Sequence, residues 1–156
     1  MSGFAIVPRV LGVDFGQARI GVAVSDELGM LAHPVETVPG RDVSAAAKRI
    51  AEIARNNNVE RIIVGLPRHM NGAIGLAAED AQAFAAKLQA LVSCPVELWD
   101  ERLSTTAANR ALRNSGMRTR QTRGIVDQVA AQMILQSYLD SRQTFGASNA
   151  EIPTPE

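Results

Sequence analysis

The sequence predicts an α/β fold in which a mixed five-stranded sheet carries helices on both faces. Three short apolar segments come first, separated by turn residues, and the apolar period then changes from two to 3.6. Beyond residue 58, two further short apolar segments alternate with helical patterns. Strands joined by tight turns form an antiparallel meander, whereas strand–helix–strand units add parallel neighbours. We therefore expect one domain over residues 1–142, followed by a polar tail, 143–156, without regular structure.

The first three strands are predicted at residues 9–15, 19–25 and 30–38. In the second strand, the alternation places Ile20, Val22 and Val24 on one face. The intervening turns are short, so these three strands form the antiparallel meander. His33 and Pro34 interrupt the third strand, which marks it as irregular or at a sheet edge.

Helical periodicity begins after the third strand. Amphipathic helices are predicted at residues 43–57 and 76–91, on either side of a short strand at 61–66. That strand is almost wholly apolar, as expected for one that is covered on both faces. A fifth strand covers 95–99, and two more helices are expected, from Ser104 to about residue 114 and over roughly 124–141.

Basic and acidic residues are equal in number, sixteen each, so net charge alone does not indicate nucleic acid. Six arginines nevertheless fall within residues 102–123, and no acidic residue interrupts 102–126. We expect this segment to bind the phosphate backbone of a nucleic acid, through Arg102, Arg118, Arg120 and Arg123. The alternative is an ordinary solvated helix face and loop.

The longest apolar runs are far too short to span a bilayer, and the first residues do not resemble a signal peptide. The single cysteine excludes an internal disulfide. We therefore expect a cytoplasmic protein without a membrane partner.

Acidic residues stand at three positions where the chemistry of a site is expected. Asp14 ends an apolar strand, where an unpaired buried charge would cost several kcal/mol. Asp100 and Glu101 close the fifth strand. Asp127 lies in the first turn of the last predicted helix, on a face of small apolar residues. The set favours a site, because the first strand, the fifth strand and the last helix can converge in this topology.

Each of these residues also has a structural interpretation. Asp14 could accept hydrogen bonds from backbone N–H groups of the turn at 16–18, and Asp127 could be favoured by the dipole of its helix. Asp100 and Glu101 could be a polar strand end. Inward carboxylates repel one another, and a divalent cation relieves the repulsion. Carboxylate oxygens without Cys or His suit Mg²⁺ or Mn²⁺, which can promote in-line displacement at phosphorus.

Four motifs carry a resemblance to a known family. LGVDFGQARIGVAVSD, IIVGLP followed by NG, LWDERLST and VDQVAAQMILQSYLD occur in this order across about residues 10–140. Together they resemble the YqgF or RuvX family of Holliday-junction-resolvase-like, pre-16S ribosomal RNA nucleases. The resemblance implies an RNase H-like fold and a metal-dependent acidic triad. Position by position, it assigns the triad to Asp14, Glu101 and Asp127, as catalytic residues and as ligands of Mg²⁺ or Mn²⁺.

The chain departs from the family pattern in two places. It has GLPRHMNG where members often have GLPLNMDG, and Gln121, Thr122 and Arg123 precede Asp127 where members often have lysines. The first difference bears on contacts of the loop, and the second on how substrate is held.

The resemblance implies a metal-dependent nuclease that acts on structured nucleic acid, in maturation of the 16S ribosomal RNA precursor. Three other functions stay open: a resolvase of branched, four-way DNA, a non-catalytic nucleic-acid-binding protein, and an ATP-binding domain of the actin–hexokinase type. The last class needs two such domains, and this chain supplies one. A symmetric resolvase would need a self-complementary apolar surface. Only Leu135 and Leu139 are candidates for one, so we expect a monomer or a weak homodimer.

Overall fold

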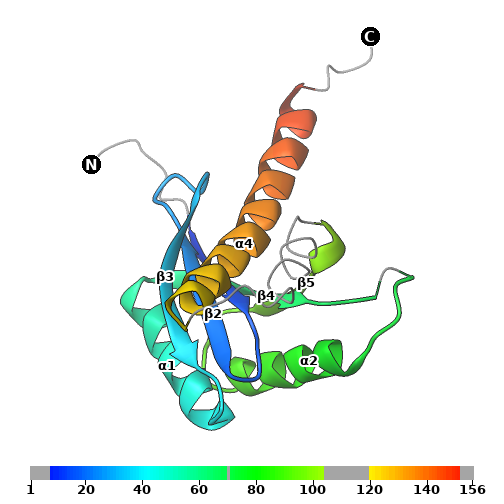
Figure 1. The fold of residues 1–156 in the computed structure, drawn as a ribbon. Helices are drawn as coiled ribbons and strands as arrows, with labels where there is room; N and C mark the ends of the chain where they lie inside the picture. The colour runs from blue at the N-terminus through cyan, green and yellow to red at the C-terminus, as the bar shows by residue number, and fades with distance from the viewer. Residues whose placement is uncertain (1–7, 70, 104–119, 152–156) are drawn as a thin grey trace.

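The computed structural model of the chain describes residues 8–69, 71–103 and 120–151, and for 120–126 and 143–151 it describes the backbone only. Its centre is a five-stranded sheet (Figure 1). The strands are β1 (Arg9–Asp14), β2 (Arg19–Ser25), β3 (Ala32–Pro39), β4 (Val59–Leu66) and β5 (Val96–Asp100). Their order across the sheet is β3-β2-β1-β4-β5.

The sheet is mixed, as the sequence predicted. β1 pairs antiparallel with β2, and β2 antiparallel with β3, which confirms the meander. β1 and β4 are parallel, as are β4 and β5. β1 and β4 are therefore central strands, and their buried residues are apolar apart from one carboxylate, Asp14.

Two helices, α1 (Val43–Asn56) and α2 (Leu76–Gln89), cover one face of the sheet. Asp42 caps α1, because its side chain accepts a hydrogen bond from the backbone N–H of Ala45. The core on this face includes the predicted alternating set Ile20, Val22 and Val24. Because side chains alternate along a strand, the intervening residues point to the opposite face.

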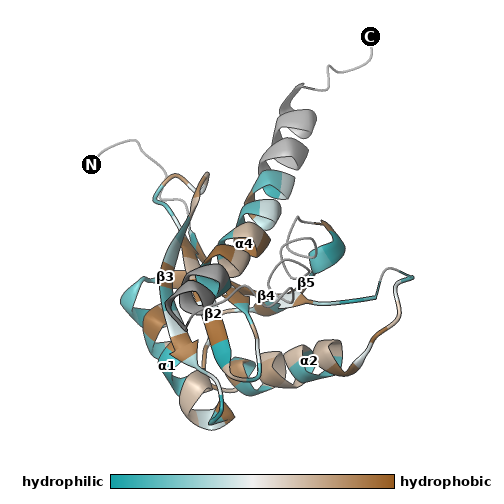
Figure 2. Cartoon of the chain, in the orientation of Figure 1, coloured by the Kyte–Doolittle hydropathy of each residue, from teal (hydrophilic) through white to brown (hydrophobic). Residues whose placement is uncertain are grey.

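The opposite face is covered by one long helix, α4 (Arg120–Glu151). Figure 2 shows apolar residues of α4, in brown, where the helix crosses the sheet. Three glutamines one turn apart fasten it to the edge strand β3: Gln128 donates to Thr37 Oγ1, Gln132 to the carbonyl of Ala32, and Gln136 accepts from the Ala32 amide. These bonds fix how α4 lies on the sheet, and hence where Asp127 lies.

The last helix differs from its predicted bounds at both ends. It begins at Arg120, and it continues through residues 143–151, where we expected a tail without regular structure. A helix already formed extends at little cost, and no proline lies between Arg120 and Pro153. The residue before a proline is disfavoured in helical geometry, which agrees with an end at Glu151. The helix predicted from Ser104 to about residue 114 lies outside the described residues.

The predicted sources of a dimer surface are in fact core residues. Leu135 is completely buried and Leu139 is 3% exposed, because both pack against the sheet. Large apolar side chains are exposed instead in the β2–β3 turn, at Leu28, Met30 and Leu31. No helix in the described ranges is both long enough and apolar enough to cross a membrane.

Candidate active site

The three acidic residues singled out in the sequence are the buried acidic side chains of the described part of the chain. Asp14 and Glu101 are 2% exposed and Asp127 is 6% exposed. They come from three elements: the end of β1, the short 3-10 helix η1 (Glu101–Leu103) that follows β5, and α4. Burying a carboxylate is unfavourable unless its charge is compensated, so three such residues indicate a role beyond folding.

A glycine in β2 brings Asp14 and Asp127 together. Gly21 pairs with Asp14 across the β1–β2 ladder. A Cβ atom on Gly21 would lie 2.0 Å from the carbonyl oxygen of Asp127, so the backbone of α4 rests directly on this glycine. Any side chain at position 21 would lift α4 away from the sheet. Asp127 is thereby held over the strand that neighbours Asp14.

A second glycine, in β4, makes room for Glu101. Val13 of β1 pairs with Val64 of β4, so the next residues, Asp14 and Gly65, are neighbours across parallel strands. A Cβ atom on Gly65 would lie 2.8 Å from Glu101 Oε2 and 2.5 Å from Ile134 Cδ1 of α4. The Glu101 carboxylate therefore occupies the space above Gly65. Asp14 lies between two glycines, each of which accommodates another acidic residue.

Asp127 has a cationic partner that the sequence analysis missed. Arg19 Nε donates to Asp127 Oδ2 over 2.7 Å, and the Asp127 side chain is 8% exposed. The two residues are 108 positions apart, so no local pattern pairs them. The only hint in the sequence is that Arg19 begins the strand that follows Asp14 across a tight turn.

The start of α4 removes the structural interpretation of Asp127 that rested on the helix dipole. α4 begins at Arg120, so Asp127 lies about two turns inside the helix. The dipole acts on charges within the first turn. Packing against β2 and the ion pair with Arg19 account for its position instead.

Asp14, Glu101 and Asp127, here called the acidic cluster, do not form a ready-made metal centre. Among the described residues, no three Asp, Glu, His or Cys side chains form a group that could hold a metal ion. The donor chemistry suits a hard divalent cation, because carboxylate oxygens at a buried site are what Mg²⁺ and Mn²⁺ bind. Arg19 supplies positive charge to Asp127 in this arrangement.

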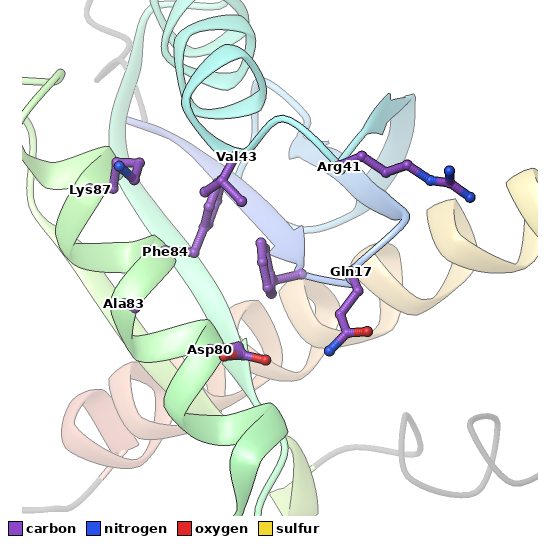
Figure 3. Close-up of a pocket in the computed structure, with 9 residues that line it drawn as sticks. Gln17, Arg41, Val43, Asp80, Ala83, Phe84 and Lys87 are labelled. Atoms are coloured by element: carbon purple, nitrogen blue, oxygen red, sulfur yellow. The ribbon is translucent and has the colours of Figure 1, made fainter.

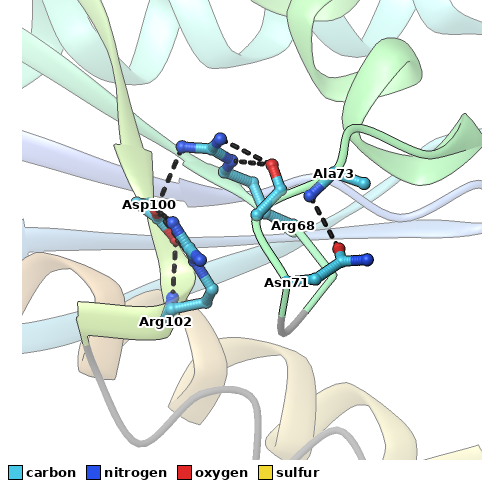
Figure 4. Close-up of polar contacts among 6 residues, drawn as sticks. Arg68, Asn71, Ala73, Asp100 and Arg102 are labelled. Atoms are coloured by element: carbon cyan, nitrogen blue, oxygen red, sulfur yellow. Dashed lines mark hydrogen bonds and ion pairs between the residues drawn. The ribbon is translucent and has the colours of Figure 1, made fainter.

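Asp100 binds two arginines (Figure 4). Arg102 Nη2 lies 2.7 Å from Asp100 Oδ2, and the Arg102 amide donates to Asp100 Oδ1. Arg68, in the loop after β4, forms an ion pair with Asp100 over 3.4 Å. The hydrogen bonds from Arg102, above all that of its side chain, hold the pKa of the Asp100 carboxyl below its usual range. The predicted phosphate ligand Arg102 is thus held by Asp100.

The other predicted phosphate ligands cannot be placed. Arg118 lies outside the described residues. Arg120 and Arg123 lie in α4, where the structure describes only their backbone. Trp99, next to the acidic pair, packs edge-on against Tyr138 of α4 with ring centroids 5.4 Å apart, and its indole donates to Ser137. It is therefore a packing residue.

A groove of about 300 Å³ lies on the opposite face of the sheet, where Phe15 follows Asp14 (Figure 3). The stacked rings of Phe15 and Phe84 line it, with centroids 4.7 Å apart. Arg41, Lys87 and Asp80 add charged groups. Its lining contains a single carboxylate, so its chemistry differs from that of the buried acidic cluster.

Residues 8–141 match the family model of RuvX, described as a Holliday junction resolvase. A relative from Moorella thermoacetica is 47% identical over 132 residues, which are 85% of this chain and 94% of the relative. One from Streptomyces avermitilis is 44% identical over 144 residues, 92% of each chain. Both carry pre-16S rRNA nuclease as a provisional name.

Solved structures show the same fold at low sequence identity. RuvC from Thermus thermophilus, in complex with a Holliday junction substrate, superposes with a TM-score of 0.57 at 16% identity. The superposition covers 88% of this chain and 97% of that one. A second structure of that RuvC gives a TM-score of 0.54 at 14% identity. These likenesses confirm the predicted RNase H-like architecture.

Proposed function

This chain belongs to the RuvX family, and from that premise we propose that it is a hydrolase that cleaves phosphodiester bonds in structured nucleic acid. The observation that carries the proposal is the burial of three carboxylates around one end of β1. A fold does not need this arrangement, since buried like charges destabilise it. A metal-dependent nuclease does need such carboxylates, to bind the cation that its reaction requires.

In this proposal Asp14, Glu101 and Asp127 are the catalytic residues and hold the metal, Mg²⁺ or Mn²⁺. When bound, such an ion activates water and stabilises the negative charge that develops on the leaving oxygen. Asp14 ends β1, and Glu101 lies over Gly65 of the neighbouring strand β4. These two carboxylates would bind the cation directly. Asp127 would complete the set, with Arg19 balancing its charge while no cation is present.

The arginines beside the acidic cluster would hold the substrate backbone. Arg102 follows Glu101 directly in the chain, and we propose that it binds a phosphate close to the catalytic carboxylates. We propose that Arg118, Arg120 and Arg123 extend this contact, since they lie in the segment that joins Glu101 to Asp127. Each contact to phosphate should make binding more sensitive to salt.

We propose structured RNA, namely the precursor of 16S ribosomal RNA, as the substrate, and hence a role in ribosome biogenesis in the cytoplasm. Relatives that are 44–47% identical over most of this chain bear the name of that activity. The solved structure bound to a four-way DNA junction is only 16% identical, which supports the fold and leaves the substrate open. Cleavage of branched DNA is the second candidate, because the family description names it.

One experiment separates these functions. Labelled 16S rRNA precursor and a labelled four-way DNA junction are incubated side by side with the protein in Mg²⁺, in Mn²⁺ and in EDTA. We expect metal-dependent cleavage of the RNA. Cleavage of the junction alone would favour the resolvase, and binding without cleavage of either substrate would indicate a non-catalytic protein.

A further inference from the structure

Arg68 and Arg102 are held side by side at the edge of the sheet, next to Glu101. Arg68 comes from the loop after β4 and Arg102 from η1 after β5. A Cβ atom on Gly72 would lie 3.4 Å from Arg102 Nη1 and 3.5 Å from Arg68 Nη2, so both guanidinium groups face the same point of the loop. Two cations this close repel each other unless negative charge lies between them.

Asp100 supplies part of that negative charge. Its Oδ2 atom lies 2.7 Å from Arg102 Nη2 and 3.4 Å from Arg68 Nη1, and its Oδ1 atom lies 3.1 Å from Arg102 Nε. Arg68 is further oriented by the Gly72 carbonyl, which accepts from Nε over 2.9 Å and from Nη2 over 2.5 Å (Figure 4). One carboxylate thus orients two guanidinium groups.

Two arginines face one aspartate here, so the formal charges of these three residues sum to +1. Both arginine side chains are about one third exposed, at 33% and 32%. Guanidinium N–H groups bind phosphate oxygens through charge-assisted hydrogen bonds. Because the orientation of these side chains is already fixed, binding costs less conformational entropy. Arg102 directly follows Glu101 in the chain.

We propose that Arg68 and Arg102 form a phosphate-binding pair for the substrate strand, and that Asp100 is the positioning residue that orients them and is not a metal ligand. This inference rests on the proposed function and adds Arg68 and Asp100 to it. The pair binds a phosphate neighbouring the one at which the bond is cleaved. Asp100 is unsuited to a metal, because both of its oxygens already accept hydrogen bonds from arginine N–H groups.

The test measures binding of labelled 16S rRNA precursor, and of a labelled four-way DNA junction, by fluorescence anisotropy in EDTA over a range of salt concentrations. Arg68→Ala should weaken binding about tenfold and reduce the slope of log Kd against log salt by about one. Arg55→Ala is the matched control, because Arg55 is an exposed arginine on α1, away from the site. It should change neither quantity appreciably. If Arg68→Ala weakened binding only by disordering its loop, the slope of log Kd against log salt would stay unchanged. That result would contradict a direct contact between Arg68 and phosphate.

Asp100→Asn makes the sharper test, because the variant is more positively charged than the wild type. If Asp100 positions the arginines, affinity should fall several-fold in spite of the added positive charge, with kcat at saturating RNA nearly unchanged. Glu60→Gln, an exposed carboxylate near the other end of β4, is the matched charge control and should not weaken binding. Circular dichroism checks that each variant is folded.

The outcomes separate this inference from the function on which it rests. Suppose that the wild type cleaves the substrate, but that Arg68→Ala binds like Arg55→Ala or that Asp100→Asn binds as tightly as the wild type. The proposed phosphate-binding pair is then wrong, and the proposed nuclease activity is unaffected. Loss of cleavage by Asp100→Asn at saturating substrate would place Asp100 in the metal site and overturn its positioning role. If the wild type binds neither nucleic acid, both proposals fail.

Discussion

At the scale of single residues, the site depends on two glycines as much as on its carboxylates. Gly65 is the clearer case, because the atoms that a Cβ would meet are the ends of two side chains, Glu101 Oε2 and Ile134 Cδ1. Such atoms can move, so the fold should accept a methyl group there while the Glu101 carboxylate is displaced. Gly21 differs, because its Cβ would meet the backbone of α4.

We predict that Gly65→Ala lowers kcat about 100-fold, since displacing a catalytic group by about 1 Å has an effect of that order. The free energy of unfolding should fall by about 1–3 kcal/mol from overpacking. Gly12→Ala is the control, because its Cβ would press on Leu135 of α4 and not on a carboxylate. Its loss of stability, measured by urea unfolding, gives the cost of overpacking beneath α4 for comparison. Unchanged kcat in Gly65→Ala would show that Glu101 does not act where the structure places it.

Arg19 is predicted to stabilise the fold through Asp127. Removing a cation 2.7 Å from a carboxylate that is 8% exposed leaves charge in a poorly solvated place. Arg19→Ala should therefore lose about 2–3 kcal/mol of unfolding free energy. Arg9→Ala should lose less than about 1 kcal/mol, because its partner Glu27 is 86% exposed and 3.6 Å away. Equal losses of unfolding free energy in the two variants, in urea titrations without metal, would show that the Arg19–Asp127 ion pair stabilises the fold no more than an exposed one.

At the scale of elements, local patterns predicted most strands and helices to within two residues. The helical period of α1 reflects burial on one face. The alternation in β2 reflects large side chains on the face of α1 and α2, and the small residues Gly21 and Ala23 beneath α4. The ends of α4 were missed, because no strong start signal precedes Arg120 and because helix extension depends on cooperativity. Contacts such as Arg19–Asp127 and Arg68–Asp100 were missed because they join elements that only the completed sheet brings together.

The link between β3 and α1 gives a pH-dependent prediction. Arg49 donates to both oxygens of Glu36, and this ion pair lowers the pKa of the Glu36 carboxyl. A carboxyl whose pKa is lower in the folded state stabilises the protein above its unfolded pKa and loses that effect as the pH falls through the folded pKa. Unfolding free energies of wild type and Glu36→Gln should therefore differ at pH 7 and converge from about pH 5 downward. A difference that stays constant down to pH 3 would contradict this assignment.

At the scale of the whole molecule, α4 packs on the sheet, and the acidic cluster lies where the two meet. The family resemblance, not the elements, pointed to the RNase H-like architecture, because the mixed sheet predicted from patterns is compatible with several folds. Asp14 and Asp127 could be chosen from the sequence because each stands among apolar residues, whereas only the family resemblance singled out Glu101 in the Asp100–Glu101 pair. The exposed Leu28, Met30 and Leu31 are a different apolar surface from the one expected, and a monomer or weak homodimer stays a prediction.

The central claim is that the buried carboxylates exist for a metal-dependent cleavage and not for the fold. Asp14→Asn tests it most directly, since the change keeps the shape of the side chain and removes one buried charge. The measurement is the rate of cleavage of labelled 16S rRNA precursor in Mn²⁺, with thermal unfolding of the same samples in EDTA. The account predicts that cleavage is lost and that Tm is unchanged or higher, because like-charge repulsion is relieved. Full cleavage by Asp14→Asn, or wild-type cleavage that persists in EDTA, would contradict it.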